Sequence, residues 1–147
     1  MGNEAHVQAP QTLVVGVSDA ETSQLAARHA VALAEASGAT VHFVTAVDHD
    51  EVKVIDMGSD EFVFDSIESA RTSVERFVQS LSSSVHYTVE AAEGSPAKAL
   101  VAVAERVGAD LIVVGNVRMQ GVGRVLGSVG ADVLRTAPCS VLIVKTV

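Results

Sequence analysis

The residue types best suited to chemistry lie in a glycine-rich stretch near the end of the chain. An apolar run ends at Gly115-Asn116-Val117-Arg118, and Gly127-Ser128-Val129 then opens an apolar helical pattern. A helix N-terminus presents unpaired N–H groups and a partial positive charge, and glycines let an anion approach them closely. The pattern therefore favours a phosphate site. The alternative is a surface loop whose glycines only turn the chain.

Charge within this stretch departs from that of the whole chain. The formal net charge is −8, yet the region from 115 to 135 carries Arg118, Arg124 and Arg135 against a single acid, Asp132. The Arg118 guanidinium is a forked donor that can bind a phosphate or remain in solvent. Arg124 and Arg135 are interpreted as surface residues or as partners of a helix dipole. The local excess of positive charge supports an anionic ligand.

Neither a P-loop nor a dinucleotide-binding fingerprint is found in the sequence. The glycine-rich stretch lacks the Lys of a P-loop, and the first strand-to-helix turn, Gly16-Val17-Ser18-Asp19, lacks the glycines of a dinucleotide-binding turn. Asp48-His49-Asp50-Glu51 is interpreted as a solvated acidic loop, because adjacent loop residues rarely converge on one metal ion. No side chain has a specific case as a general base, so the sequence names no reaction.

Composition limits the class of protein. The chain has 147 residues, 48% of them hydrophobic, which suits one globular domain with a sizeable core. Its sequence pI of about 4.9 and its 3% of aromatic residues argue against a nucleic-acid partner. Because no apolar run approaches the roughly 20 residues of a membrane-spanning helix, no membrane partner is expected.

The compartment is predicted from the first residues and from cysteine usage. Residues 1–10 lack the basic-then-apolar order of a signal peptide and are predicted to be a disordered leader, followed by one domain over 11–147. The single Cys139 excludes an intramolecular disulfide and is predicted to be a buried strand thiol rather than a nucleophile. We therefore expect a cytoplasmic protein.

Alternating apolar runs and helical patterns must position the candidate residues. Strands are predicted at 12–17, 40–47, 85–91, 111–114 and 140–145, and helices at 25–36, 63–81, 96–104 and 129–136. This alternation indicates a parallel sheet covered on both faces. Ligands of such sheets bind beyond the carboxyl ends of the strands, where both the glycine-rich stretch and the Ser18-Asp19 turn fall. Ser18 and Asp19 there either cap the next helix or contact the sugar or base of a ligand.

Several segments, taken in this order, resemble the universal stress protein family. Leu13 to Val17 is similar to the family's first strand, and Gly94-Ser95-Pro96-Ala97 is similar to its G-x-P-A turn. Ala109 to Gly115 is similar to the family's a-D-L-I-V-x-G strand. Gly127-Ser128-Val129 and Ala137 to Val144 are similar to its closing G-S-V and A-P-C-P-V-L-V-V patterns. The resemblance covers nearly the whole predicted domain.

The resemblance implies a three-layer α/β/α fold of the adenine nucleotide alpha hydrolase-like kind. Its open, parallel, five-stranded sheet has the order 3-2-1-4-5. The resemblance also implies a homodimer, which in many members forms through pairing of the last strands, and those strands carry Val141 and Ile143 here. Some members bind ATP or another adenine nucleotide through G-x2-G-x9-G-[ST], whereas others bind none.

Carried over residue by residue, that motif begins at Gly115 and ends at Gly127-Ser128. Arg118 stands at the second glycine, and the spacing from Arg118 to Gly127 is one residue short. The family's nucleoside-facing acid falls on Ser18, with Asp19 beside it. Ala46 falls where the second strand meets the adenine.

We therefore predict a protein that binds an adenine nucleotide such as ATP or AMP, with or without Mg, as a regulatory ligand in a stress response. The predicted nucleotide-binding residues are Val17, Ser18, Asp19, Ala46, Gly115, Asn116, Arg118, Gly127, Ser128 and Val129. The alternative is a stress dimer that binds no nucleotide and acts through protein partners. An enzyme, at most a weak ATPase or a synthetase, ranks last because the S-G-G-x-D-S loop of related synthetases is absent from residues 17–23.

Overall fold

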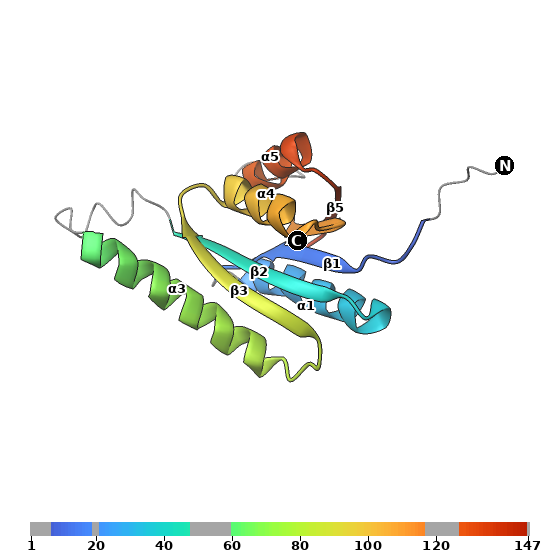
Figure 1. Ribbon diagram of the computed structural model, residues 1–147, viewed down its shortest axis with the longest axis horizontal. Helices are drawn as coiled ribbons and strands as arrows, with labels where there is room; N and C mark the ends of the chain where they lie inside the picture. The colour runs from blue at the N-terminus through green and yellow to red at the C-terminus, as the bar shows by residue number, and fades with distance from the viewer. Residues whose placement is uncertain (1–6, 19–20, 48–59, 117–126, 147) are drawn as a thin grey trace.

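The computed structural model of the protein (Figure 1) describes residues 7–18, 21–47, 60–116 and 127–146, with the backbone alone over 60–65. The strands are β1 (Thr12–Gly16), β2 (Thr40–Val47), β3 (His86–Glu93), β4 (Leu111–Gly115) and β5 (Ser140–Val144). The helices are α1 (Glu21–Ser37), α3 (Asp60–Ser80), α4 (Pro96–Val107) and α5 (Ser128–Thr136). The predicted alternation of strands and helices is confirmed.

The strands form one parallel sheet with the order β3-β2-β1-β4-β5, as the sequence predicts. Residues 12–16 of β1 pair with residues 40–44 of β2, and residues 13–15 pair with residues 111–113 of β4. From β1 the chain winds outward through β2 to β3, and it then crosses back to β4 on the other side of β1. The winding therefore reverses between β1 and β4, where such sheets open a crevice beyond the carboxyl ends of their strands.

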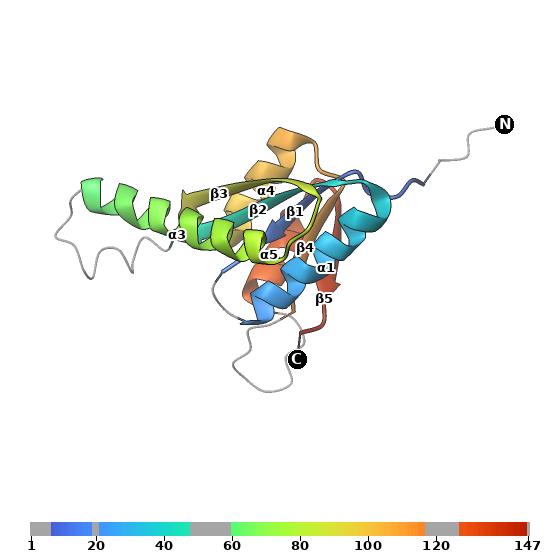
Figure 2. The ribbon, with the colours of Figure 1, turned by 90° about the horizontal axis from the view of Figure 1, so that it is seen from below.

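Helices cover both faces of the sheet (Figures 1 and 2). On the face of α1 and α3, Leu13, Val15 and Phe43 pack in one buried cluster with the alanines of α1. On the face of α4 and α5, Val14 and Ile112 pack in a second cluster with side chains of both helices. Neighbouring residues of β1 thus enter opposite clusters, which explains why this strand reads as a continuous apolar run.

The ends of α4 follow the signals in the sequence. Ser95 caps the helix by accepting the Lys98 N–H at 3.4 Å, and Pro96 occupies the first helical position. Gly108 ends the helix with φ 67, a left-handed conformation that favours glycine. These short turns fix α4 across β1 and β2, beside the carboxyl ends of the strands.

Cys139 lies one residue before β5 and is half-buried, so the prediction of a buried strand thiol is only partly right. It packs against the buried cluster beneath α4 and α5. Burial, together with the nearby Asp110 carboxylate, raises the pKa of the Cys139 thiol. A raised pKa reduces the thiolate fraction at neutral pH, which agrees with an unreactive thiol.

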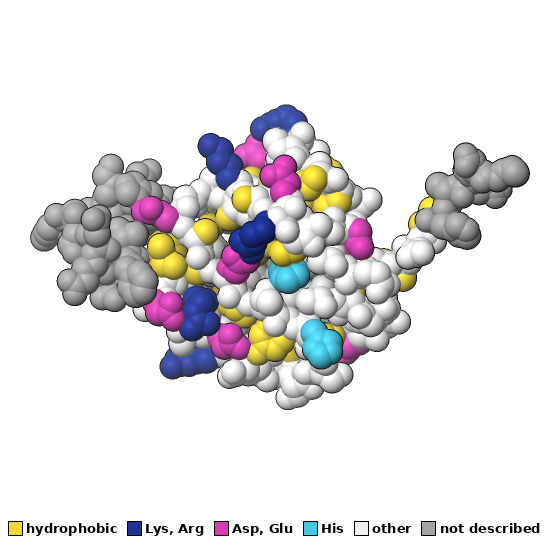
Figure 3. All heavy atoms as spheres, viewed as in Figure 1, with side chains coloured by type: hydrophobic (Ala, Val, Ile, Leu, Met, Phe, Trp, Pro, Cys, Tyr) yellow, Lys and Arg dark blue, Asp and Glu magenta, His cyan; other side chains and the backbone are white. Residues whose placement is uncertain are grey.

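Charged side chains of both signs are interspersed on the face shown in Figure 3. Among the described residues, Arg71 pairs with Glu68 at 2.8 Å, and Arg106 pairs with Glu90. No helix of the described part of the chain is long and apolar enough to cross a membrane. Residues 1–6 of the predicted leader over 1–10, and residues 48–59 with the predicted acidic loop, lie outside the described residues. A cytoplasmic location stays a prediction.

Candidate functional site

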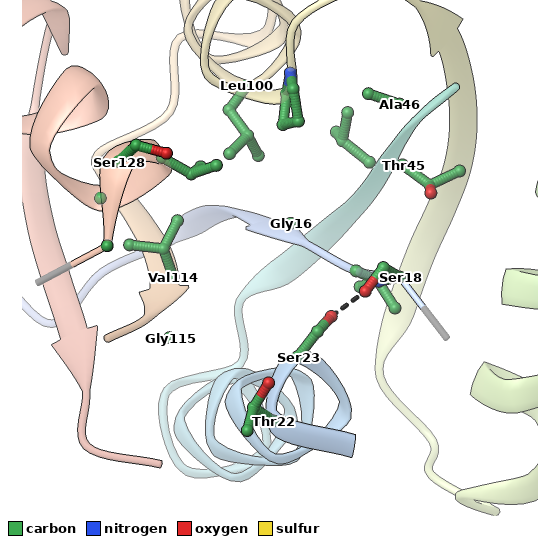
Figure 4. Close-up of a pocket in the computed structure, with 16 residues that line it drawn as sticks. Gly16, Ser18, Thr22, Ser23, Thr45, Ala46, Leu100, Val114, Gly115 and Ser128 are labelled. Atoms are coloured by element: carbon green, nitrogen blue, oxygen red, sulfur yellow. Dashed lines mark hydrogen bonds between the residues drawn. The ribbon is translucent and has the colours of Figure 1, made fainter. Parts of the chain in front are cut away.

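A pocket of about 390 Å³ opens beyond the carboxyl ends of β1, β2 and β4, at the point where the winding reverses (Figure 4). It brings together seven of the predicted residues, which are Val17, Ser18, Ala46, Gly115, Gly127, Ser128 and Val129. Asp19 and Arg118 lie outside the described residues. Asn116 is described but is not among the residues that line the pocket.

Two glycines allow helices to pack directly against the strand ends beneath the pocket. A Cβ added at Gly16 would lie 3.2 Å from Leu100 Cδ1 of α4. A Cβ added at Gly115 would lie 3.3 Å from Thr146 Cγ2 and 3.6 Å from the Thr22 carbonyl oxygen of α1. A side chain at Gly16 would therefore crowd Leu100, and one at Gly115 would crowd Thr146.

The start of α5 forms one end of the pocket. Gly127 has extended backbone (φ −75, ψ 172) and, lacking a side chain, makes no side-chain cap for the helix. In the first turn of any helix the N–H groups have no partner within the helix, and here those of Ser128, Val129 and Gly130 belong to residues that line the pocket. Their partial positive charge makes this end suitable for an anion.

Asn116 holds the start of α5 in place. Its carbonyl oxygen accepts the Gly127 N–H at 3.0 Å, which joins the residue after β4 to the residue before α5. Its side-chain oxygen accepts the N–H of Thr146 at 2.8 Å and the hydroxyl of Thr146 at 2.9 Å. The residue is buried, with 8% of its surface exposed. Asn116 therefore acts as a positioning residue, a role that depends on a partner thirty residues away in the sequence.

The pocket has a wall of hydroxyl groups on the side of α1. The Ser18 N–H donates to Ser23 Oγ at 2.6 Å, so the first turn of α1 reaches back to the end of β1 (Figure 4). Thr22 and Thr45 line the same pocket. The opposite wall is apolar and comes from Val44, Ala46, Pro96, Leu100 and Val129.

Sequence reasoning missed Thr22, Ser23, Thr45, Pro96 and Leu100 as lining residues. Thr45 directly precedes the predicted Ala46, and Pro96 lies in the G-x-P-A turn, so both were adjacent to recognised signals. Their contribution to the pocket depends on the strand order and on α4 lying across β1 and β2, neither of which a local pattern reveals.

The described lining carries no charged side chain and no His or Cys, so this part of the site offers no general base. Arg135, one of the three predicted cations, forms an exposed ion pair with Asp132 at 2.6 Å on α5. Arg124, like Arg118, lies outside the described residues. Within the described ranges, no group of three His, Cys, Asp or Glu side chains could hold a metal ion. The described lining offers backbone N–H groups and hydroxyls, both of which can bind a ligand.

Comparisons with known proteins agree with this architecture. The sequence profile of the universal stress protein family matches residues 10–145. A universal stress protein of Methanocaldococcus jannaschii is 32% identical over 139 residues, which cover 90% of this chain and 81% of that protein. A solved universal stress protein in complex with cAMP is 32% identical, with a TM-score of 0.71 over 95% of this chain and 100% of the other. One from Archaeoglobus fulgidus in complex with dAMP shares the fold at 20% identity, with a TM-score of 0.66 over 94% of this chain and 100% of the other. The chain therefore belongs to the universal stress protein family.

Proposed function

We propose that this protein binds an adenine nucleotide in the pocket and that the nucleotide is a regulatory ligand in a stress response. The observation that carries the proposal is that one pocket of about 390 Å³ joins an uncapped helix start to an apolar wall. The relative at 32% identity, solved with cAMP, supports the same class of ligand.

The proposed orientation places the phosphate at α5 and the base toward β2. Neighbouring strands lie about 4.8 Å apart, so the ends of β4 and β2 are separated by roughly 10 Å. That span suits a nucleoside monophosphate. The apolar wall formed with Ala46, Pro96 and Leu100 matches the flat face of a base, while the N–H groups of the first turn of α5 match the phosphate.

A regulatory role, rather than turnover, is supported by the chemistry of the described lining. Backbone N–H groups and neutral hydroxyls can hold a phosphate, but they do not move a proton at neutral pH. Residues that could hold Mg are not gathered in the described part of the chain. We therefore expect binding without appreciable hydrolysis, which a phosphate-release assay against a protein-free control would check.

The test removes one backbone donor at the start of α5. Ser128 is the first residue of the helix, where proline is tolerated, and Gly127 with ψ 172 already has the conformation that a following proline needs. Ser128→Pro deletes the N–H and the hydroxyl together, whereas the control Ser128→Ala deletes the hydroxyl alone. A bond from N–H to phosphate contributes about 1.5–3 kcal/mol. Titration calorimetry with AMP, cAMP and ATP should show roughly a tenfold or greater loss of affinity in Ser128→Pro and a smaller loss in Ser128→Ala.

Equal affinities in Ser128→Pro and Ser128→Ala would contradict the proposal that the phosphate binds at the start of α5.

The rival proposal is a stress dimer that binds no nucleotide. It is favoured by one observation: Ser18 replaces the family's acid, and the Ser18 N–H already donates to Ser23. The absence of saturable binding by any adenine nucleotide at millimolar concentration would decide for that rival.

We also propose that the protein is a homodimer through β5, which lies at the edge of the sheet. Val141 and Ile143 of this strand are only partly buried, and an edge strand leaves one row of backbone groups available for pairing. Val141→Lys should shift the sedimentation coefficient toward that of a monomer. An unchanged dimer in that variant would place the interface elsewhere.

A further inference from the structure

Asn116 joins the end of β5 to the start of α5. Its backbone N–H donates to the carbonyl oxygen of Val144, the last residue of β5, at 3.0 Å. Its side-chain oxygen accepts the N–H and the hydroxyl of Thr146, and its backbone carbonyl oxygen accepts the Gly127 N–H. One buried residue therefore holds both the last strand and the residue that precedes α5.

Thr146 also lies directly behind the wall of the pocket. A Cβ added at Gly115 would lie 3.3 Å from Thr146 Cγ2 and 3.6 Å from the Thr22 carbonyl oxygen, so these three residues are packed together. Gly115 and Thr22 line the pocket, whereas Thr146 is not among the lining residues. Because packed side chains leave little free space, a movement of the segment that follows β5 would disturb the lining.

β5 lies at an edge of the sheet, where one row of its backbone groups faces no other described strand (Figure 2). The strand is apolar from Val141 to Val144. The opposite edge strand, β3, carries Glu90 and Glu93, and charged residues of this kind discourage an edge strand from pairing with another copy. Of the two edges, β5 is therefore the one that suits a second copy of the chain.

Resting on the proposed function and on the proposed homodimer, we propose that nucleotide binding and the pairing of β5 with a second copy strengthen each other through Asn116. The element with two arrangements is the segment 145–146, which is either bound to Asn116 or released from it. A partner strand that holds β5 favours the bound arrangement. A phosphate at α5 favours it as well, because Asn116 also holds Gly127. Two ligands that favour one arrangement bind cooperatively, and their coupling is reciprocal.

The first experiment measures the dimer dissociation constant by sedimentation of a dilution series, with and without saturating AMP. We expect the dimer to bind AMP roughly fivefold more tightly than the monomer, at the lower end of typical couplings. Because a dimer holds two pockets, saturating AMP should lower its dissociation constant by the square of that factor, about 25-fold.

Substitutions at Thr146 test whether the coupling runs through Asn116. Thr146→Pro deletes the N–H and the hydroxyl that Asn116 accepts, and the position lies beyond the paired residues of β5, so no bond between strands is lost. In this variant AMP should leave the dimer dissociation constant unchanged. The control Thr146→Val deletes the hydroxyl alone and should keep part of the effect.

The second experiment measures the reciprocal effect by titration calorimetry with AMP, which does not require the wild-type dimer to dissociate. Val141→Lys, which weakens pairing at β5, should bind AMP roughly fivefold more weakly than the wild-type protein. In the background of Thr146→Pro the same substitution should have no further effect, which separates coupling from damage to the pocket. His86→Lys, on the opposite edge strand, should bind AMP with wild-type affinity.

The outcomes separate this inference from the proposals on which it rests. If AMP binds and the protein dimerises, but neither event affects the other, or if Thr146→Pro keeps the full coupling, this inference alone is overturned. A protein that stays monomeric at all concentrations would overturn the homodimer together with this inference. If the wild-type protein does not bind AMP or another adenine nucleotide, the proposed function fails with it.

Discussion

The two ends of the sheet treat their polar groups in opposite ways. At the amino ends of the strands, the Asp110 carboxylate accepts the Gln11 N–H at 3.0 Å and the Thr12 N–H at 3.3 Å, and the Thr40 N–H donates to the Gln11 carbonyl at 3.0 Å. At the carboxyl ends, α5 begins without a side-chain cap, and the N–H groups of its first turn belong to residues that line the pocket. At the amino ends, hydrogen bonds between polar groups of the protein join the strands. At the carboxyl ends, backbone N–H groups that have no partner within their helix mark the proposed binding end.

Asn116 lies at the binding end, but its side-chain oxygen and its carbonyl oxygen both accept hydrogen bonds from the protein, as the groups at the opposite end do. It ties the end of β4 to Thr146, two residues beyond β5, and to Gly127, which precedes α5. These hydrogen bonds of Asn116 hold the start of α5 in place, and with it the N–H groups that are proposed to bind the phosphate. Substitutions at the two ends should then separate stability from affinity.

The largest effect is expected from Asn116→Ala. This substitution removes two buried hydrogen bonds and leaves the Thr146 N–H without its acceptor, so the free energy of unfolding in urea should fall by about 2–3 kcal/mol. Nucleotide affinity should fall with it, because the frame around α5 is loosened. Thr146→Val removes only one of the bonds and should cost about half as much. If Asn116→Ala lost nucleotide affinity while its free energy of unfolding stayed at the wild-type value, the Asn116 side chain would instead contact the ligand directly.

An intermediate effect is expected from Asp110→Ala at the opposite end. The exposed carboxylate accepts two backbone N–H groups, and its loss should lower the free energy of unfolding by about 1 kcal/mol. Nucleotide affinity should not change, because Asp110 lies at the amino ends of the strands and the pocket lies at their carboxyl ends. Asp110→Asn keeps one acceptor oxygen and serves as the milder control. A weaker nucleotide complex in Asp110→Ala would show that the two ends are coupled.

The smallest effect concerns His42, which lies on the sheet away from both ends, with Nδ1 2.7 Å from Thr88 Oγ1. Burial lowers the pKa of His42 below its usual 6.5, Glu90 opposes the change and Arg106 adds to it. As the pH falls below 6.5 the unfolded chain takes up a proton that the folded chain resists, so stability decreases in that window. Urea unfolding at about pH 7.5 and about pH 5.5 should show a shallower loss in His42→Gln. The same loss in both proteins would assign the pH dependence to other groups.

Much of the fold could be predicted because its signals are local. The apolar runs of β1 and β4 are buried on both faces, and Ser95, Pro96 and Gly108 mark the ends of α4 by their own backbone preferences. The strand order, by contrast, came from the resemblance to a family rather than from periodicity. Cys139 shows the limit of local patterns, because its apolar and β-prone neighbours did not reveal that the residue is only half-buried.

The sequence predicted the lining residues whose backbone groups suit a ligand. It did not predict those that line the pocket only because of how the strands and helices pack. Gly115, Gly127 and Ser128 were found because glycines at a helix start signal an anion. Thr45 and Leu100 were missed because each becomes a lining residue only when β2 and α4 are placed beside β1. Asn116 is predicted to contact the ligand, and its side-chain oxygen also accepts two bonds from Thr146, a partner that no spacing in the sequence indicates.

The most direct test of the central claim is the amide proton–nitrogen spectrum of the whole protein during titration with AMP. The account predicts that the amides of Ser128, Val129 and Gly130 shift saturably, while those of Gly38 and Gly108, at the opposite end of the sheet, stay in place. Amides at the start of α5 that do not move at saturating AMP, or shifts confined to the opposite end, would contradict it.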